Sequence, residues 1–253
     1  MLVDERRHLI AESVIARGAA TVAELSARFG VSQVTIRSDL EALERAGTVT
    51  RNRGGAVANR VSRFTPAFQQ RSSVNHDAKR AIAERAEATI LDGDRIVLDA
   101  GSTTLYLADL LCHRRLTVAV NSVYTMNKLA DAPNLDLVLV GGTLYKPALS
   151  FGGTLGEEFL DRLHFDKAIL GVNGISDRGI SVNNPQEAGV KRKMAGQAER
   201  VIILADSSKV GIDSLVRIET LDQVDTLITE KPVPPKLEKV WRKAHPELEI
   251  LIA

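Results

Sequence analysis

The sequence of 253 residues predicts an α/β protein in two parts, a small N-terminal domain and a larger, doubly wound domain around a mostly parallel sheet. Two observations predict this division. Helix-capping residues and a short β-hairpin pattern fill the first 58 residues, whereas continuous apolar runs alternate with helical stretches after residue 76. We therefore expect domains at residues 1–58 and 77–253, joined by a polar linker at residues 59–76.

The composition is that of an ordinary globular protein, with 44% hydrophobic and 26% charged residues. No apolar run approaches the roughly 18 residues that span a bilayer, and the charged N-terminus lacks a signal-peptide core. We therefore expect a cytoplasmic protein with no membrane partner. Cys112 is the single cysteine, so no internal disulfide can form, and the five histidines lack zinc-binding spacing. The sequence thus predicts no metal and no cofactor.

The N-terminal helices are predicted from apolar spacing and from the residues at their ends. A first helix is expected over residues 4–17. Thr21 can cap a second helix, and Glu24 three residues later completes a capping box. Gly30 then permits a sharp turn, and Ser32 is a suitable N-cap for a third helix with an apolar stripe. Two short helices joined by a tight turn indicate a helix-turn-helix.

The third helix carries polar residues in its first two turns, where a recognition helix meets base edges in the major groove. These residues are Gln33, Thr35, Arg37 and Ser38. After it, residues 48–50 predict a strand, residues 51–55 a tight turn, and Ala56 the start of a return strand. Such a wing would place Arg51 and Arg53 against the DNA backbone or the adjacent minor groove. The alternative is a small helical domain that binds protein, which the two wing arginines disfavour.

The third helix and the wing together resemble a known protein family. VSQVTIRSDLEALERAG followed by RNRGGAV resembles the N-terminal signature of the DeoR family of bacterial repressors in order and spacing. The resemblance implies that the DNA-contacting residues are Ser32, Thr35, Arg37, Arg51 and Arg53. Two positions depart from the family pattern, because Ser38 stands where a second Arg is usual and Arg53 where a His is common. The first removes an expected DNA contact and the second adds a permanent charge, so base preference is expected to differ.

The larger domain is predicted from seven short apolar runs separated by helical stretches. The runs are Ile96–Leu98, Leu116–Val120, Leu135–Val140, Lys167–Gly171, Val201–Ala205, Thr226–Thr229 and Leu248–Ile252. Continuous apolar strands of this kind indicate a parallel sheet covered by helices on both faces.

Small polar residues follow five of these runs, at strand ends where open parallel sheets bind ligands. They begin at Asp99, Asn121, Gly141, Val172 and Asp206. Gly101-Ser102-Thr103-Thr104 also opens a helix, so its free N–H groups would face an anion, with Lys146, Lys191 or Lys209 as a point charge. Each element alone has a plain structural explanation as a cap or a turn. Together they predict one site for a small phosphorylated ligand with several hydroxyls.

The resemblance extends to this domain through LDAGSTTLYLADLL, LVGGTLY, GISVNNPQEAGVKRKM and ILADSSKVG. These segments look like the DeoR-family effector domain, which is related to ribose-5-phosphate isomerases and is understood to bind phosphorylated sugars or their breakdown products. The resemblance implies a phosphate site at Gly101, Ser102, Thr103 and Thr104. It implies further site residues at Asn121, Ser122, Gly142, Lys146, Asn173, Glu187, Lys191 and Lys209. Residues 150–153, with two glycines, are expected to form a mobile flap.

The leading hypothesis is a repressor of a carbohydrate catabolic operon that binds double-stranded operator DNA and responds to a phosphorylated sugar. Helix-turn-helix proteins usually bind as dimers, so a homodimer or homotetramer is expected. One alternative is a sugar-phosphate isomerase, for which Asp99, Glu187 or Asp206 could supply an acid. It is disfavoured because no acid follows Gly141-Gly142 in the next turn. The other alternative is an architectural DNA-binding protein with a vestigial sensor.

Overall fold

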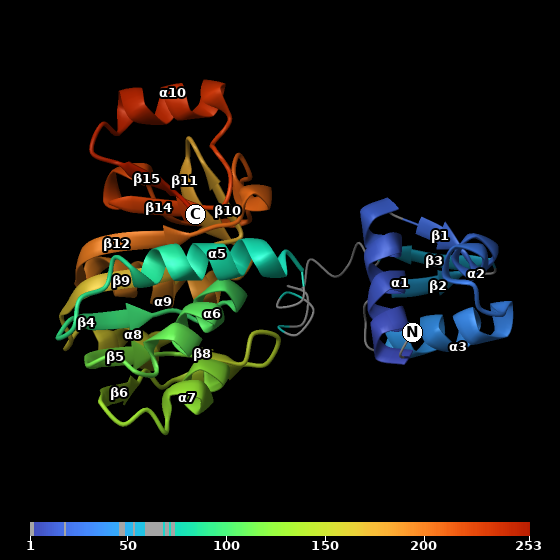
Figure 1. Cartoon of the computed structure of the whole chain (residues 1–253), viewed down its shortest axis with the longest axis horizontal. Helices are drawn as coiled ribbons and strands as arrows, with labels where there is room; N and C mark the ends of the chain where they lie inside the picture. Colours follow the sequence, from blue (N-terminus) through green and yellow to red (C-terminus); the bar gives the residue numbers. More distant parts are fainter. Residues whose placement is uncertain are drawn as a thin grey trace. The chain divides into compact units, whose positions relative to one another are not determined.

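The computed structural model describes residues 3–17, 19–45, 49–52, 54–58, 68, 71 and 74–253. Contacts divide the chain into two units, Met1–Pro66 and Ala67–Ala253, which are coloured along the sequence in Figure 1. Each unit has its own hydrophobic core. Most of the predicted linker lies outside the described residues, as do Thr48 of the predicted strand and Arg53 of the predicted wing.

The N-terminal unit combines three helices with a three-stranded antiparallel sheet of order β1-β3-β2. Its elements are α1 Val3–Arg17, β1 Ala19–Thr21, α2 Val22–Phe29, α3 Gln33–Arg45, β2 Val49–Asn52 and β3 Gly55–Ala58. The predicted capping box is present, since Thr21 Oγ1 accepts the Glu24 N–H at 3.2 Å and the Glu24 carboxylate accepts the Thr21 N–H at 2.7 Å. Gly30 ends α2 in the left-handed conformation, with φ of 65°. The helix-turn-helix pattern is therefore confirmed.

The hairpin differs from the prediction. Arg51 and Asn52 belong to β2 and Gly55 begins β3, so the predicted turn at residues 51–55 was too long. Asn52 lies opposite Gly55, which leaves a connection of two residues. This is the commonest length of connection in β-hairpins. The strand β1, which pairs with β3, was not predicted from the sequence. A side chain at Gly55 would lie 2.1 Å from the Ala20 carbonyl oxygen, so this pairing requires a glycine.

The C-terminal unit is built on a seven-stranded sheet of order β15-β14-β12-β9-β4-β5-β6, in which every neighbouring pair is parallel. Its strands are β4 Arg95–Leu98, β5 Leu116–Val120, β6 Leu135–Leu139, β9 Phe165–Gly171, β12 Ala198–Leu204, β14 Thr226–Thr229 and β15 Glu249–Ile252. All seven predicted runs form strands of this one sheet, which confirms the α/β fold class.

Helices and two small sheets complete this unit. Over residues 76–253 the helices are α5 His76–Glu87, α6 Ser102–Leu111, α7 Val123–Leu129, α8 Thr154–Leu160, α9 Pro185–Gly196 and α10 Pro235–Ala244, with short 3₁₀ turns η1 Ser207–Lys209 and η2 Leu221–Gln223. One small sheet joins β10 Gly174–Ser176, β11 Gly179–Val182 and β13 Val216–Glu219. The other is a hairpin of β7 Thr143–Tyr145 and β8 Ser150–Gly152. None of the helices in the described part of the chain is long and apolar enough to cross a membrane.

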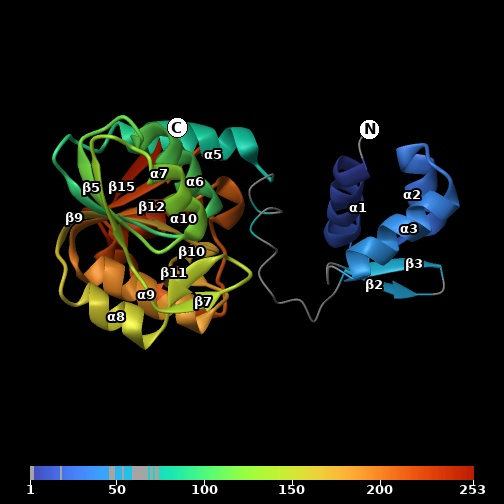
Figure 2. The ribbon, with the colours of Figure 1, turned by 90° about the horizontal axis from the view of Figure 1, so that it is seen from below.

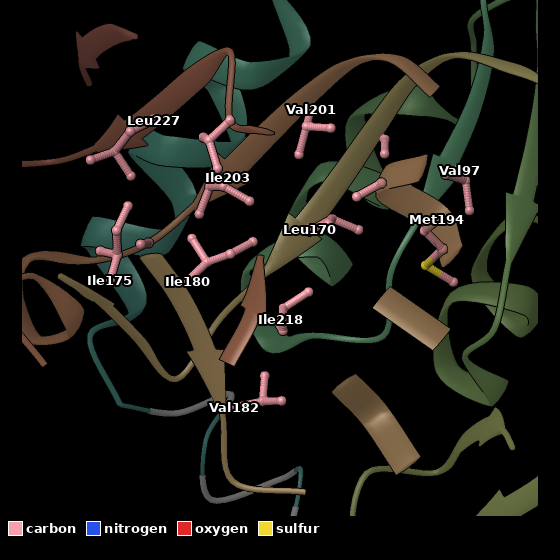
Figure 3. Packing of buried hydrophobic residues seen from close by; sticks show 14 of the residues in the cluster. Val97, Leu170, Ile175, Ile180, Val182, Met194, Val201, Ile203, Ile218 and Leu227 are labelled. Atoms are coloured by element: carbon pink, nitrogen blue, oxygen red, sulfur yellow. The ribbon is translucent and has the colours of Figure 1, made fainter. Parts of the chain in front are cut away.

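The central strands are apolar on both faces because two cores cover them. Along β12, Val201 and Ile203 belong to one core and Ile202 and Leu204 to the other. The first core includes residues of α8, α9 and β10–β11, and Figure 3 shows Ile180, Ile175 and Met194 in this cluster with Leu170 between Ile180 and Met194. The second includes residues of α5, α6 and α7, and Figure 2 shows α5 and α6 away from α8 and α9. The sheet is therefore doubly wound.

Candidate functional site

A recess lies at the carboxyl ends of the central strands. It holds about 300 Å³ of empty space, part of it open to solvent. Its lining comprises Asp99, Ala100, Asn121, Thr143, Tyr145, Ser150, Phe151, Gly152, Gln186 and Glu187. Strands β5 and β6 lie to one side of β4, and β9, β12, β14 and β15 lie to the other. The order of the strands thus reverses at β4, and such a switch point is where open α/β sheets bind ligands.

A buried ion pair joins the two strands at this switch point. Asp99 follows β4, and its carboxylate oxygen Oδ2 accepts from Lys191 Nζ, which comes from α9. Lys191 Nζ also donates to the Gly171 carbonyl oxygen at the end of β9, at 2.9 Å. The Gly171 N–H donates back to Asp99 Oδ2 at 3.2 Å. The predicted point charge of Lys191 is therefore neutralised by Asp99 within this network.

The hairpin β7–β8 forms one wall of the recess, and Asn121 holds it there. Asn121 Oδ1 accepts the Ala100 N–H at 2.8 Å, and its Nδ2 donates to the Phe151 carbonyl oxygen at 3.2 Å. The Phe151 N–H in turn donates to the Asn121 carbonyl oxygen at 2.7 Å. The segment expected to be a mobile flap is thus tied to the end of β5, and its movement stays a prediction.

Glu187 enters the recess from the first turn of α9. Asn184 caps this helix, with its Oδ1 accepting the N–H groups of Gln186 and Glu187 at 2.8 and 3.4 Å. Burial raises the pKa of the Glu187 carboxyl above its usual range. The positive charge of Lys191 opposes this shift, and the nearby Asp99 adds to it. The recess therefore carries two carboxyl groups, one ion-paired and one with a raised pKa.

The helix that was expected to bind phosphate begins beside the recess. Gly101 is the N-cap of α6 in an extended conformation, and it supplies no side chain to the first N–H groups. Thr104 Oγ1 donates to the Asp99 carbonyl oxygen at 2.6 Å, so this hydroxyl holds the strand end. The first N–H groups of α6 stay available for an anion, because a helix leaves them unpaired.

Other predicted site residues lie outside the recess lining. Ser122 is buried and caps α7, where its Oγ accepts the Thr125 N–H at 3.3 Å. Asn173 Oδ1 accepts the Asn183 N–H at 3.2 Å. Gly142, with φ of 125°, comes so close to β8 that a side chain would lie 2.4 Å from the Gly152 carbonyl oxygen. Lys146 is exposed at the hairpin tip. The part these residues play in ligand binding stays a prediction.

Lys209 lies in a separate polar cluster. Asp206 caps η1, because its Oδ1 accepts the Ser208 N–H at 3.1 Å, which is the plain structural explanation for this segment. Asn75 Nδ2 also donates to Asp206 Oδ1 at 3.1 Å. Burial lowers the pKa of Lys79 to about 8, with Asp206 opposing the shift and Lys209 adding to it. The charge of Lys209 is thus close to those of Asp206 and Lys79.

Several lining residues were not predicted from the sequence. Tyr145 and Phe151 were passed over because hairpin strands of three residues carry little periodic signal. Gln186 was passed over although it lies next to Glu187 in the helix start. Among the described residues, no group of three or more His, Cys, Asp or Glu side chains is arranged to hold a metal ion. The lining itself carries hydroxyl, amide and carboxyl groups that can form hydrogen bonds with a ligand.

The N-terminal unit presents the second candidate site, on α3. Ser32 caps the helix, with its Oγ accepting the Thr35 N–H at 3.1 Å. Gln33, Arg37 and Ser38 are all exposed, and Arg37 Nη2 donates to Gln33 Oε1 at 3.3 Å. Val34, which was not predicted as a contact, is 72% exposed beside them. This helix surface matches the donor, acceptor and apolar groups that major-groove recognition uses.

Ion pairs with α1 hold α3 in place on the side opposite to its exposed surface. Asp39, on the inner face of α3, is 1% exposed and accepts from Arg6 Nε at 2.7 Å and Arg7 Nε at 3.0 Å. On the wing, the Arg51 N–H donates to Glu44 Oε1 at 2.9 Å, and its guanidinium lies 3.7 Å from the same carboxylate. Arg51 is exposed, and Arg53 lies outside the described residues.

Comparisons with known proteins identify both units of the chain. Residues 6–61 match the DeoR-like helix-turn-helix domain, and residues 74–231 match the DeoR C terminal sensor domain. The chain is 37% identical over 236 residues to the HTH-type transcriptional regulator YulB of Bacillus subtilis, covering 93% of this chain and 92% of that protein. It is 35% identical to the L-fucose operon activator of Haemophilus influenzae, covering 92% and 94%, and 35% identical to the HTH-type transcriptional repressor GlcR of Bacillus subtilis, covering 91% and 90%.

Among solved structures, ribose 5-phosphate isomerase A from Methanocaldococcus jannaschii aligns with a TM-score of 0.40 at 18% identity, covering 54% of this chain and 55% of the isomerase. The two domain matches together span both structural units, and full-length relatives match over nine-tenths of the chain. The chain therefore belongs to the DeoR family of DNA-binding transcriptional regulators.

Proposed function

We propose that this regulator represses a carbohydrate catabolic operon and that a phosphorylated sugar, or a related metabolite, bound in the recess changes its affinity for the operator. The observation that carries the proposal is the pairing, in one chain, of an exposed recognition helix with a polar recess at the switch point of a parallel sheet. Family membership makes the chain a regulator and not the isomerase that the sequence left open.

The lining supports a ligand with several hydroxyl groups. Asn121, Thr143, Tyr145, Ser150 and Gln186 all carry groups that both donate and accept hydrogen bonds. The Glu187 carboxyl adds an acceptor, and its raised pKa makes it a donor at a higher pH than an ordinary carboxyl. The start of α6 adds N–H groups suited to a phosphate.

The relatives support the regulatory role. One is named an L-fucose operon activator and another a transcriptional repressor, so both signs of control occur among proteins of this similarity. We propose repression, with release by the ligand, for this chain. Helix-turn-helix proteins usually bind two half-sites as dimers, so the proposal includes a homodimer or homotetramer in the cytoplasm.

The test is a thermal-shift screen of pentose and hexose phosphates, followed by operator binding with and without each ligand that raises the melting temperature. Arg37→Ala should lose operator binding and keep the thermal shift. Gln186→Ala should lose the thermal shift and keep operator binding. The hydrogen bond from Gln186 to the cap residue Asn184 uses its backbone N–H, so the alanine variant keeps it. Gln223→Ala, at an exposed position in η2 away from the recess lining, is the matched control.

Two results would contradict the proposal. If no sugar phosphate raises the melting temperature, the sensor assignment fails. If a sugar phosphate binds in the recess and operator affinity stays the same, the protein is an architectural DNA-binding protein with a vestigial sensor.

A further inference from the structure

Arg71, near the start of the C-terminal unit, interacts electrostatically with residues that line the recess. The Arg71 guanidinium lies over the Phe68 ring, 5.7 Å from its centroid. Its Nε and Nη2 atoms are buried, and neither has a hydrogen-bond partner among the residues that the structure describes. Buried guanidinium nitrogens are almost always paired, since an unpaired buried charge is costly. Both nitrogens can therefore still donate a hydrogen bond to a ligand.

The acidic groups that interact with the Arg71 guanidinium belong to residues that line the recess. Burial lowers the pKa of the guanidinium, and the negative groups that oppose this shift are Glu187, Asp99 and Tyr145. All three line the recess. Asp99 is engaged by Lys191, and neither Asp99 nor Glu187 accepts a hydrogen bond from Nε or Nη2 of Arg71. Arginine stays protonated even when it is buried, so a positive charge faces this site.

Hydrogen bonds hold the Arg71 carbonyl group to Lys79 and hold Phe68 to the hairpin that lines the recess. Lys79 Nζ donates to the carbonyl oxygens of Arg71 and Val74. Phe68 stacks on Tyr124 with ring centroids 4.4 Å apart, and its N–H donates to the Pro147 carbonyl oxygen at 3.2 Å. Pro147 belongs to the β7–β8 hairpin, whose Tyr145 lines the recess.

We propose that Arg71 is an effector-binding residue whose Nε and Nη2 donate to the phosphate group of the ligand in the recess. The proposal rests on the proposed function for the presence of a phosphorylated ligand. A planar guanidinium with two free donors matches two phosphate oxygens at once. Arg71 follows the division between the two units at residues 66 and 67 by only a few residues. A ligand held by Arg71 therefore binds the segment of chain that continues to the DNA-binding unit.

The test compares Arg71→Met with Arg80→Met, in which an exposed arginine on α5 that pairs with Glu84 is removed. Thermal unfolding of each full-length variant is followed with no anion, with inorganic phosphate, and with the pentose and hexose phosphates. We expect the wild type and Arg80→Met to gain the same protection. Arg71→Met should lose on the order of tenfold in affinity for phosphorylated ligands. Without any anion it should melt no lower than the wild type, because an unpaired buried charge is gone.

Equal protection of the wild type and Arg71→Met would overturn the assignment of Arg71 and leave the proposed function standing. No protection of the wild type by any phosphorylated compound would overturn both. If Arg71→Met does not fold, Arg71→Lys keeps the charge and loses the planar pair of donors, and it should bind phosphate more weakly than the wild type. Operator affinity is measured on the same samples, where Arg71→Met should bind DNA normally and need on the order of tenfold more sugar phosphate for the same response.

Discussion

Lys191 and Asp99 form an ion pair across the switch point of the sheet, with side chains only 5% and 2% exposed. They stand 92 residues apart in the sequence, and no bulk water compensates either charge when its partner is lost. Removing one partner of such a pair costs about 3–5 kcal/mol, whereas replacing both by apolar or neutral groups is often near neutral. The pair therefore fixes the geometry of the recess more than it adds to stability.

We expect Asp99→Asn and Lys191→Met each to lower the free energy of unfolding of the C-terminal unit by about 3 kcal/mol. The double variant should lose clearly less than the sum of the two. Urea unfolding of the four proteins gives this coupling directly. Lys193→Met is the matched control on the same helix, since its partner Asp161 is 44% exposed and an exposed pair contributes at most about 1 kcal/mol. Additive losses at Asp99 and Lys191 would show that the pair is not coupled.

Glu187 predicts a pH dependence of stability. Its folded-state pKa is raised, so the folded protein holds this proton at a higher pH than the unfolded chain does. The ionised carboxylate therefore destabilises the fold at neutral pH, and this penalty is relieved as the pH falls through the folded pKa. We expect Glu187→Gln to be more stable than the wild type at pH 8, with the difference vanishing near the ordinary pKa of glutamate. Unfolding free energies measured from pH 4.5 to 8 check this, and a difference that grows toward acid would contradict it.

We expect a substitution at the buried residue Asp39 to weaken DNA binding by destabilising the N-terminal unit. It joins α3 to Arg6 and Arg7 of α1. Hydrogen bonds to charged groups contribute about 1.5–3 kcal/mol, so Asp39→Asn should destabilise this unit by about 2 kcal/mol. Operator affinity should fall equally for all operator sequences, because Asp39 faces away from the exposed surface of α3. Glu41→Gln, an exposed change on the same helix, should have little effect on unfolding. Selective loss at one base pair would instead indicate a direct contact.

The sequence predicted the main sheet well because buried parallel strands are continuous apolar runs. The strands it missed have only three or four residues, too few for a periodic signal, and some, such as β1 with β3, also pair with a strand far along the chain. The strand ends identified Asp99 and Asn121 as lining residues, since parallel topology brings these ends together. Arg71 could not be found this way, because its place depends on how Phe68 and Lys79 fasten the chain to the folded unit. The pairing of Lys191 with Asp99 likewise follows from tertiary structure alone.

Val34 predicts one element of operator specificity. It is 72% exposed in the first turn of α3, and Ser38 stands one helical turn further on, where relatives are expected to carry an arginine. An exposed valine at this point suits contact with the methyl group of a thymine in the major groove. Burying one such methyl group contributes about 0.8 kcal/mol, which corresponds to roughly a fourfold change in affinity.

Deoxyuridine carries uracil, which is thymine without that methyl group, and so gives a direct test. Substituting it for each thymine of the operator in turn should weaken binding of the wild type roughly fourfold at one position in each half-site. Val34→Ala should bind the unmodified operator more weakly and be insensitive to deoxyuridine at that same position. Gln33→Ala serves as the control, because it removes a neighbouring exposed side chain with no methyl group and should keep the sensitivity. If every deoxyuridine substitution affects the wild type and Val34→Ala alike, Val34 does not contact a thymine methyl, and base selection by α3 depends on Gln33 and Arg37.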